Sequence, residues 1–224
     1  MIIQIKQIAS NIKQMYLISG DYSCQGKIGN ASKYQKIELF NKNGELLYCK
    51  YHLSHWTNYI PIRYLFGFLN LTREFQIFKN GSYFGNFVFS RHGYYKSCYI
   101  ITLNDGSVLY CYTRLKGSFN YISIYKDDIQ IALVETYLTV TDLNYKHKLY
   151  LSDDYSEYKE VLSLFVLYFA NYNFTKRFHM TAGTSFTKRW SYSKYNDKYD
   201  PSWRKKYFPK ENFFGKLNFF DEKL

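Results

Sequence analysis

The sequence predicts a mainly β fold: a closed antiparallel barrel of about twelve strands around a central hydrophobic C-terminal helix, followed by a basic, aromatic-rich C-terminal extension. Three observations support this. Aromatic residues make up 21% of the chain and prolines number only three, and aromatic and β-branched side chains suit a pleated sheet. Dipeptides that favour tight hairpin turns recur along the chain. One late segment, 161–170, is apolar except for Ser163.

The length of 224 residues allows one large domain, or a domain with a tail. We expect the barrel and its helix over residues 1–174. The extension over 175–224 is expected to pack on the barrel or to be partly disordered.

At the N-terminus, apolar residues recur at helical spacing. The pattern of Ile5, Ile8, Ile12 and Met15 predicts a short helix that plugs one end of the barrel, with a membrane anchor as the alternative.

Turn dipeptides then divide the chain into strands. Asn43-Gly44, Asn80-Gly81 and Asp105-Gly106 favour two-residue hairpin loops, and Asp127-Asp128 is a weaker signal of the same kind. The stretch 53–72 is less regular and predicts a loop with a short helix or strand. The predicted strands are 14–19, 24–28, 35–42, 45–52, 73–79, 82–90, 95–104, 107–114, 119–126, 129–136, 137–142 and 146–151.

Apolar residues meet across two of these turns. Around Asp127-Asp128, Ile122 falls opposite Leu133. Around Asp105-Gly106, Ile100 and Cys111 share one face of a strand pair that is apolar on both sides. Both sides of that pair are therefore expected to be covered.

The apolar segment 161–170 predicts a helix without a polar face. A bilayer-spanning helix needs about 20 apolar residues, and shorter runs more often mark a buried helix. Asp154 followed by Glu157 is typical of a helix start, so we place the helix at 155–172. A closed barrel needs an interior filling, and this helix is suited to provide it.

Four stretches carry a resemblance to a known family. They read EFQIFKNGSYFGNFVF, YIITLNDGSVLYCYT, ISIYKDDIQIALVET and KLYLSDDYSEYKEVLSLFVLYFANYNF. Over residues 14–174 the order of elements resembles the tubby C-terminal-like superfamily, which includes tubby proteins, phospholipid scramblases and LURP-one-related proteins, and in particular its small bacterial single-domain members. The resemblance implies a twelve-stranded barrel around a hydrophobic C-terminal helix.

The same resemblance implies a link to lipids. Tubby proteins bind phosphoinositides through Lys and Arg on neighbouring strands and a loop, and scramblase-like members act at membranes. No such basic set aligns with this chain residue by residue. The tail after 175 also departs from the family pattern, in which the chain ends soon after the helix.

Motifs of catalysis are not found in the sequence. It contains no nucleophile elbow, HExxH or phosphate-binding loop, so we expect a protein that is not an enzyme and uses no cofactor or metal. His92 and His147 are the candidate bases. Asp153 and Asp154 are either paired carboxylates or, as we favour, helix caps.

The cysteines indicate a location in the cell. Cys24, Cys49, Cys98 and Cys111 fall singly, and no signal-peptide pattern precedes them. Reduced thiols in a cytoplasmic protein are the expected state.

The tail is the basic part of a chain with a net charge of +12. Residues 172–224 hold twelve Lys or Arg against five Asp or Glu, together with fifteen aromatic residues. One interpretation is that the rings cover the outside of the barrel, including the Ile100 and Cys111 patch. Another is docking on a membrane surface, where aromatic rings and lysines meet anionic headgroups. Nucleic acid, through stacking and phosphate contacts, is less favoured.

We therefore predict a non-enzymatic protein that binds anionic phospholipid or a membrane surface, cytoplasmic or peripheral at the membrane. The alternative is a protein–protein interaction module with a structural extension. The candidate lipid-binding residues are Lys188, Arg189, Trp190, Trp203, Arg204, Lys205 and Lys206.

Overall fold

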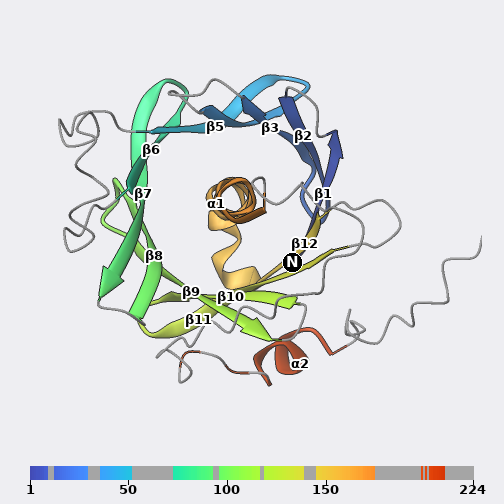
Figure 1. The fold of residues 1–224 in the computed structure, drawn as a ribbon, viewed down its shortest axis with the longest axis vertical. Coiled ribbons are helices and arrows are strands. Elements are labelled where there is room, and N and C mark those ends of the chain that lie inside the picture. Colours follow the sequence, from blue (N-terminus) through green and yellow to red (C-terminus); the bar gives the residue numbers. More distant parts are fainter. Residues whose placement is uncertain are drawn as a thin grey trace, which may run out of the picture.

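A computed structural model describes residues 1–9, 13–29, 36–51, 73–92, 96–116, 119–138, 145–174, 198, 200 and 202–209. Within these residues twelve antiparallel strands form one closed barrel, in which each strand pairs with its neighbours in the sequence and β1 pairs with β12. Viewed down its axis, the barrel is a ring with helix α1 inside it (Figure 1). The predicted fold class is confirmed.

The strands and helices have these bounds. The strands are β1 Ile2–Ala9, β2 Lys13–Gly20, β3 Cys24–Gly29, β4 Lys36–Asn41, β5 Gly44–Tyr51, β6 Arg73–Lys79, β7 Ser82–His92, β8 Lys96–Leu103, β9 Val108–Lys116, β10 Phe119–Lys126, β11 Ile129–Leu138 and β12 Tyr145–Leu151. The helices are η3 Asp153–Tyr158, α1 Lys159–Phe174 and α2 Trp203–Tyr207. The stretch 53–72 lies outside the described residues.

The predicted N-terminal helix is wrong, because residues 2–9 form β1 and close the barrel between β12 and β2. Ile3 and Ile5 are buried while Gln4 and Lys6 are exposed, which is the period of two that a strand requires. The separate strand 137–142 is also not observed, since residues 137–138 continue β11 and 139–144 lie outside the described residues. These two errors offset each other in the strand count.

The registers predicted around Asp127-Asp128 and Asp105-Gly106 are each wrong by one residue. Ile122 lies opposite Val134, because the pairing of β10 with β11 shifts between Ile124 and Tyr125. The shift turns Leu133 to the outside of the barrel. Between β8 and β9 the loop is longer than two residues, and Tyr99 lies opposite Cys111.

Cys111 consequently lies in the barrel core with no exposed surface. Ile100 pairs instead with Tyr110, which is exposed. The expected outer patch of Ile100 and Cys111 is therefore not formed.

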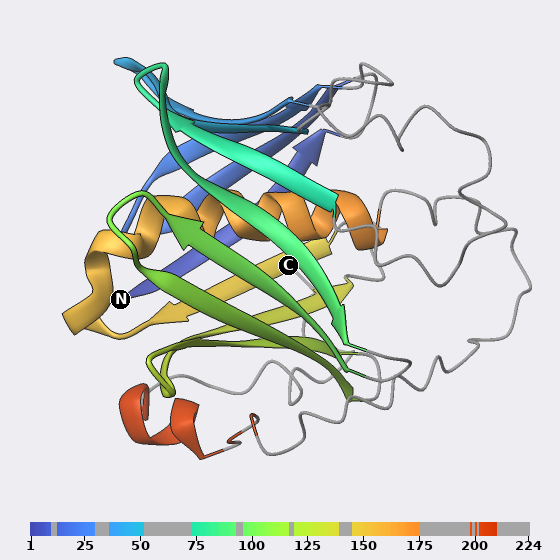
Figure 2. The ribbon, with the colours of Figure 1, turned by 90° about the vertical axis from the view of Figure 1, so that its left-hand side faces the viewer.

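Helix α1 is enclosed by the strands along its length. Every residue from 161 to 170 is buried, and the side view shows the helix running along the barrel axis (Figure 2). On one side Leu167 packs against the backbone of β3 at Gly26. On the side of β6 to β8 aromatic rings fill the interior: the ring of Phe87 lies 5.4 Å from that of Tyr168. Among the described helices, none is long and apolar enough to cross a bilayer.

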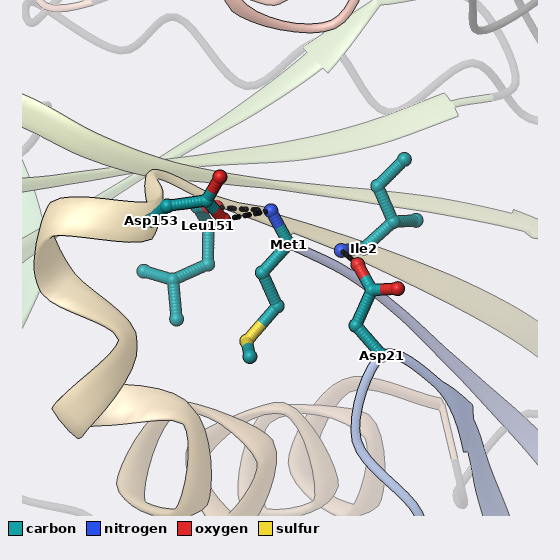
Figure 3. A network of polar contacts seen from close by, with 5 residues as sticks. All are labelled: Met1, Ile2, Asp21, Leu151 and Asp153. Atoms are coloured by element: carbon teal, nitrogen blue, oxygen red, sulfur yellow. Dashed lines mark hydrogen bonds and ion pairs between the residues drawn. The ribbon is translucent and has the colours of Figure 1, made fainter.

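The helix begins differently from the prediction. η3 starts at Asp153, and the preceding Ser152 is its N-cap, without a side-chain capping bond. Asp154 is therefore not the cap. Asp153 instead accepts a hydrogen bond of 2.6 Å from the Met1 amino group, which also donates to the Leu151 carbonyl oxygen (Figure 3).

A second carboxylate fastens the other edge of β1. The Ile2 N–H donates to Asp21 Oδ2 at 2.6 Å (Figure 3). The strand that closes the barrel is thus held at its first residues from both sides.

Gly26 tests how tightly α1 packs. We expect Gly26→Ala to lower the free energy of unfolding by about 1–3 kcal/mol, because a Cβ there would overlap the Leu167 side chain inside a packed core. Gly29→Ala is the control on the same strand, since the nearest atom to its Cβ would be the Lys36 carbonyl oxygen at 3.8 Å. Urea denaturation measures both variants. Equal stability of the two would contradict close packing of α1 on β3.

Candidate functional site

Four neighbouring strands carry lysines and no carboxylate. β12, β1, β2 and β3 lie side by side in the barrel, and within the bounds given above they contain five lysines and no Asp or Glu. We call the outer face of these four strands the basic wall. Barrel closure assembles it, because β12 and β1 come from opposite ends of the barrel sequence. Its lysines are Lys6, Lys13, Lys27, Lys146 and Lys148.

Two of these lysines oppose each other directly. Lys6 and Lys146 are partners in the β1–β12 ladder, and both point outward because their neighbours Ile5 and His147 are buried. Like charges in directly opposed positions destabilise a strand pair. Neither lysine has an ion-pair partner among the described residues. An anion bound here would relieve this repulsion.

A second opposed pair on the barrel is compensated. Lys36 lies opposite Lys50 in the β4–β5 ladder. Lys36 Nζ, however, lies 2.6 Å from Glu38 Oε1 and 2.7 Å from Glu45 Oε2. Of the two opposed lysine pairs in the described ladders, only Lys6 with Lys146 lacks a carboxylate partner.

Two other lysines of the basic wall are less available. Lys27 Nζ lies 3.5 Å from Glu38 Oε2 of β4. Lys148 is buried, with its Nζ 5.4 Å from the centre of the Tyr150 ring. The side chain of Lys13 lies outside the described residues. Among the lysines whose side chains the structure describes, Lys6 and Lys146 therefore dominate the charge that the wall offers to solvent.

Exposed aliphatic side chains lie beside Lys6. Leu17 is its partner on β2 and is 43% exposed. Ile8, two residues along β1 at a register shift, is 53% exposed. Of the exposed side chains that the structure describes on the basic wall, none is aromatic.

Trp203 does not lie at the surface as a membrane anchor would. It is 5% exposed and packs on the outer wall of the barrel against Tyr121, Leu133 and Tyr150. Its indole Nε1–H donates to the Gln130 carbonyl oxygen at 2.9 Å. Leu133 needs this cover because the register shift in β11 turns it outward.

Arg204 is buried as well, at 5% exposure. Its Nη1 donates to the Tyr150 hydroxyl at 3.2 Å, and its Nε lies 3.7 Å from Glu135 Oε1. Tyr150 Oη in turn donates to Glu135 Oε2 at 3.3 Å. Burial of both residues corrects the prediction that Trp203 and Arg204 contact lipid: they hold α2 to the barrel.

The remaining predicted residues divide into two groups. Lys205 and Lys206 are exposed on α2, with the Lys206 Nζ 5.1 Å from the centre of the Tyr207 ring. α2 lies on the outside of the barrel next to β10 and β11 (Figure 1), and its flanking residue Phe208 packs with Tyr150 of β12. Lys188, Arg189 and Trp190 lie outside the described residues.

Carboxylates gather at one end of the barrel. The turns after the even-numbered strands and the start of η3 form this end, which we call the hairpin rim (Figure 2). Some of these carboxylates are paired: Asp153 with the Met1 amino group, and Asp128 with Lys198 at 2.8 Å. The exposed members are Asp21, Asp105, Asp127, Asp128, Asp153, Asp154 and Glu157.

The candidate catalytic groups lie in different places. His147 points into the barrel, where its Nδ1 is 2.8 Å from Thr136 Oγ1, and burial lowers its pKa to about 3. The His92 side chain lies outside the described residues. Asp153 is held by the Met1 amino group. That the protein is not an enzyme stays a prediction.

Burial makes the four cysteine thiols unreactive. All four cysteines are free and buried, and burial raises the pKa of Cys24 to about 11. In the described part of the chain no group of three His, Cys, Asp or Glu side chains could hold a metal ion.

No protein-family model, curated protein or solved structure matches this chain. The fold that the tubby-like resemblance implies is observed. Membership of that superfamily stays a prediction.

The contact between Arg204 and Glu135 can be tested by a double-mutant cycle. Arg204→Gln removes the guanidinium that lies beside the buried Glu135 carboxylate, so we expect a loss of about 1–3 kcal/mol in the free energy of unfolding. Arg204→Gln combined with Glu135→Gln should cost less than the sum of the two single changes. Lys205→Gln, at an exposed neighbouring position, is the control. Equal effects of Arg204→Gln and Lys205→Gln in urea denaturation would show that the pair does not hold α2.

Proposed function

We propose that this protein is a non-enzymatic barrel that attaches to an anionic phospholipid surface through the basic wall. One observation carries the proposal: four adjacent strands without a carboxylate present the opposed pair Lys6 and Lys146 next to exposed Ile8 and Leu17. Cations beside aliphatic side chains match a surface that is charged at its headgroups and apolar beneath them.

The expected attachment is weak and reversible. A lysine close to an anionic membrane contributes about 1 kcal/mol, and this contribution falls off within a Debye length. Lys6 and Lys146 therefore account for about 2 kcal/mol. Binding should weaken as the salt concentration rises.

The chemistry of the wall favours lipid over nucleic acid. Proteins that bind single strands stack bases on aromatic rings, and the exposed described side chains of the basic wall include none. Ile8 and Leu17 instead suit contact with acyl chains. This distinction supports the lipid hypothesis on the barrel itself, apart from the resemblance to a family.

Helix α2 lies near the hairpin rim, because it packs on the outer face of β10, β11 and β12 and Trp203 donates to Gln130, close to the Asp127-Asp128 turn. Lys205 and Lys206 are exposed on this helix, and their predicted contact with lipid is independent of the attachment through the basic wall. Trp203 and Arg204 position this helix. Lys188, Arg189 and Trp190 remain proposed contacts.

Charge reversal at Lys6 is expected to affect lipid binding and folding stability in opposite directions. Lys6→Glu removes a like-charge pair and should raise stability by about 0.2–1 kcal/mol. The same change should weaken binding to vesicles of phosphatidylcholine and phosphatidylserine roughly ten- to thirtyfold. Co-sedimentation measures the binding and urea denaturation the stability. Because the two effects have opposite signs, weaker binding cannot be attributed to misfolding.

Lys50→Glu is the matched control. Lys50 is an exposed lysine that also faces a lysine across a strand pair, but it lies on β5, away from the basic wall. We expect the affinity of the Lys50→Glu variant for anionic vesicles to differ from that of wild-type protein by less than about threefold. The proposal fails if wild-type protein shows no preference for anionic over neutral vesicles. It also fails if the two variants lose equal affinity.

A further inference from the structure

We infer that the barrel meets the bilayer with one end of the basic wall, so that Ile8 and Leu17 enter the boundary between headgroups and acyl chains while the hairpin rim faces water. This inference rests on the proposed function and adds to it an orientation and two inserting residues. It uses the placement of exposed aliphatic side chains along the barrel axis.

Ile8 and Leu17 form one small apolar patch. Leu17 is opposite Lys6 in the β1–β2 ladder, and Ile8 is the next outward residue on β1. The register shift at Gln7 and Ala9 leaves Ile8 without a direct partner in this ladder. Two of the most exposed large aliphatic side chains described in the structure thus lie together on the wall that carries no carboxylate.

The position of Ile8 and Leu17 along the barrel axis determines which end of the barrel meets the membrane. β1 begins at the hairpin rim, where Met1 contacts Asp153, and runs away from it (Figures 2 and 3). Ile8 is the last residue but one of this strand and therefore lies towards the opposite end. The apolar patch thus lies at the end of the wall away from the hairpin rim, so insertion of Ile8 and Leu17 leaves the rim on the water side.

Lysine geometry agrees with this orientation. Lys6 lies between Lys146 on one side and Leu17 on the other. Long lysine side chains keep the ammonium group at headgroup level while their methylene groups lie along apolar surface. With Leu17 at the boundary, Lys6 and Lys146 are placed among phosphate and carboxylate groups.

Ile129 supplies a matched control. It is an exposed isoleucine, 57% against 53% for Ile8, but it lies on the hairpin rim directly after Asp128. The two positions therefore have the same side chain and similar exposure at opposite ends of the barrel. In the proposed orientation position 8 faces the membrane, whereas position 129 faces water.

The experiment places an environment-sensitive NBD fluorophore at each position through Ile8→Cys and Ile129→Cys. The native cysteines are buried and do not compete for the label in folded protein. With vesicles of phosphatidylcholine and phosphatidylserine, NBD at position 8 should shift to the blue and be quenched by spin-labelled lipid, and NBD at position 129 should do neither. In parallel, Ile8→Ser and Leu17→Ser should each weaken vesicle binding roughly fivefold, and Ile129→Ser should not.

The outcomes separate the two claims. If wild-type protein binds anionic vesicles but NBD at position 8 stays in water, or NBD at position 129 enters the lipid, the orientation is wrong and the proposed function stands. If wild-type protein does not bind anionic vesicles in co-sedimentation, both claims are overturned.

Discussion

Enclosure of α1 is the constraint on which the rest of this structure depends. A helix that is apolar on every side must be surrounded on every side, and a barrel of twelve strands does this without leaving a sheet edge. The interior is filled unevenly: a glycine, Gly26, admits the helix on one side, and rings such as Phe87 fill the other. With the core complete inside the barrel, the outer faces of the strands are free to carry charge.

The sequence predicts the fold class more reliably than it predicts the first strand and the strand registers. A ten-residue apolar run and repeated turn dipeptides are local signals, and they predicted the helix and most strands. The nature of β1 was missed because Ile5, Ile8 and Ile12 fit a helical period as well as Ile3 and Ile5 fit a strand period. Only pairing with β12 and β2 decides between the two. The β10–β11 register failed because a single bulged residue moves every later side chain to the other face, and the β8–β9 register failed because the loop is longer than two residues.

The candidate site could be predicted only in part, for a similar reason. The absence of acids from residues 1–20 is visible in the sequence, but its continuation in β12 appears only when the barrel closes. Trp203 and Arg204 were assigned to a membrane surface on composition. Their actual partners, Gln130 and Glu135, are more than 60 residues away and carry no local signal. A buried contact and an exposed one can thus share the same basic, aromatic composition.

The most direct test of the enclosed helix is the reactivity of a thiol at position 163. The Ser163 hydroxyl is buried and has no hydrogen-bond partner among the described residues, so cysteine is a conservative replacement there. In folded Ser163→Cys, a maleimide should react no faster than the protein unfolds globally, whereas Ser82→Cys, at an exposed position, should react at once. Rapid labelling at position 163 under native conditions would place α1 outside the barrel and contradict the account.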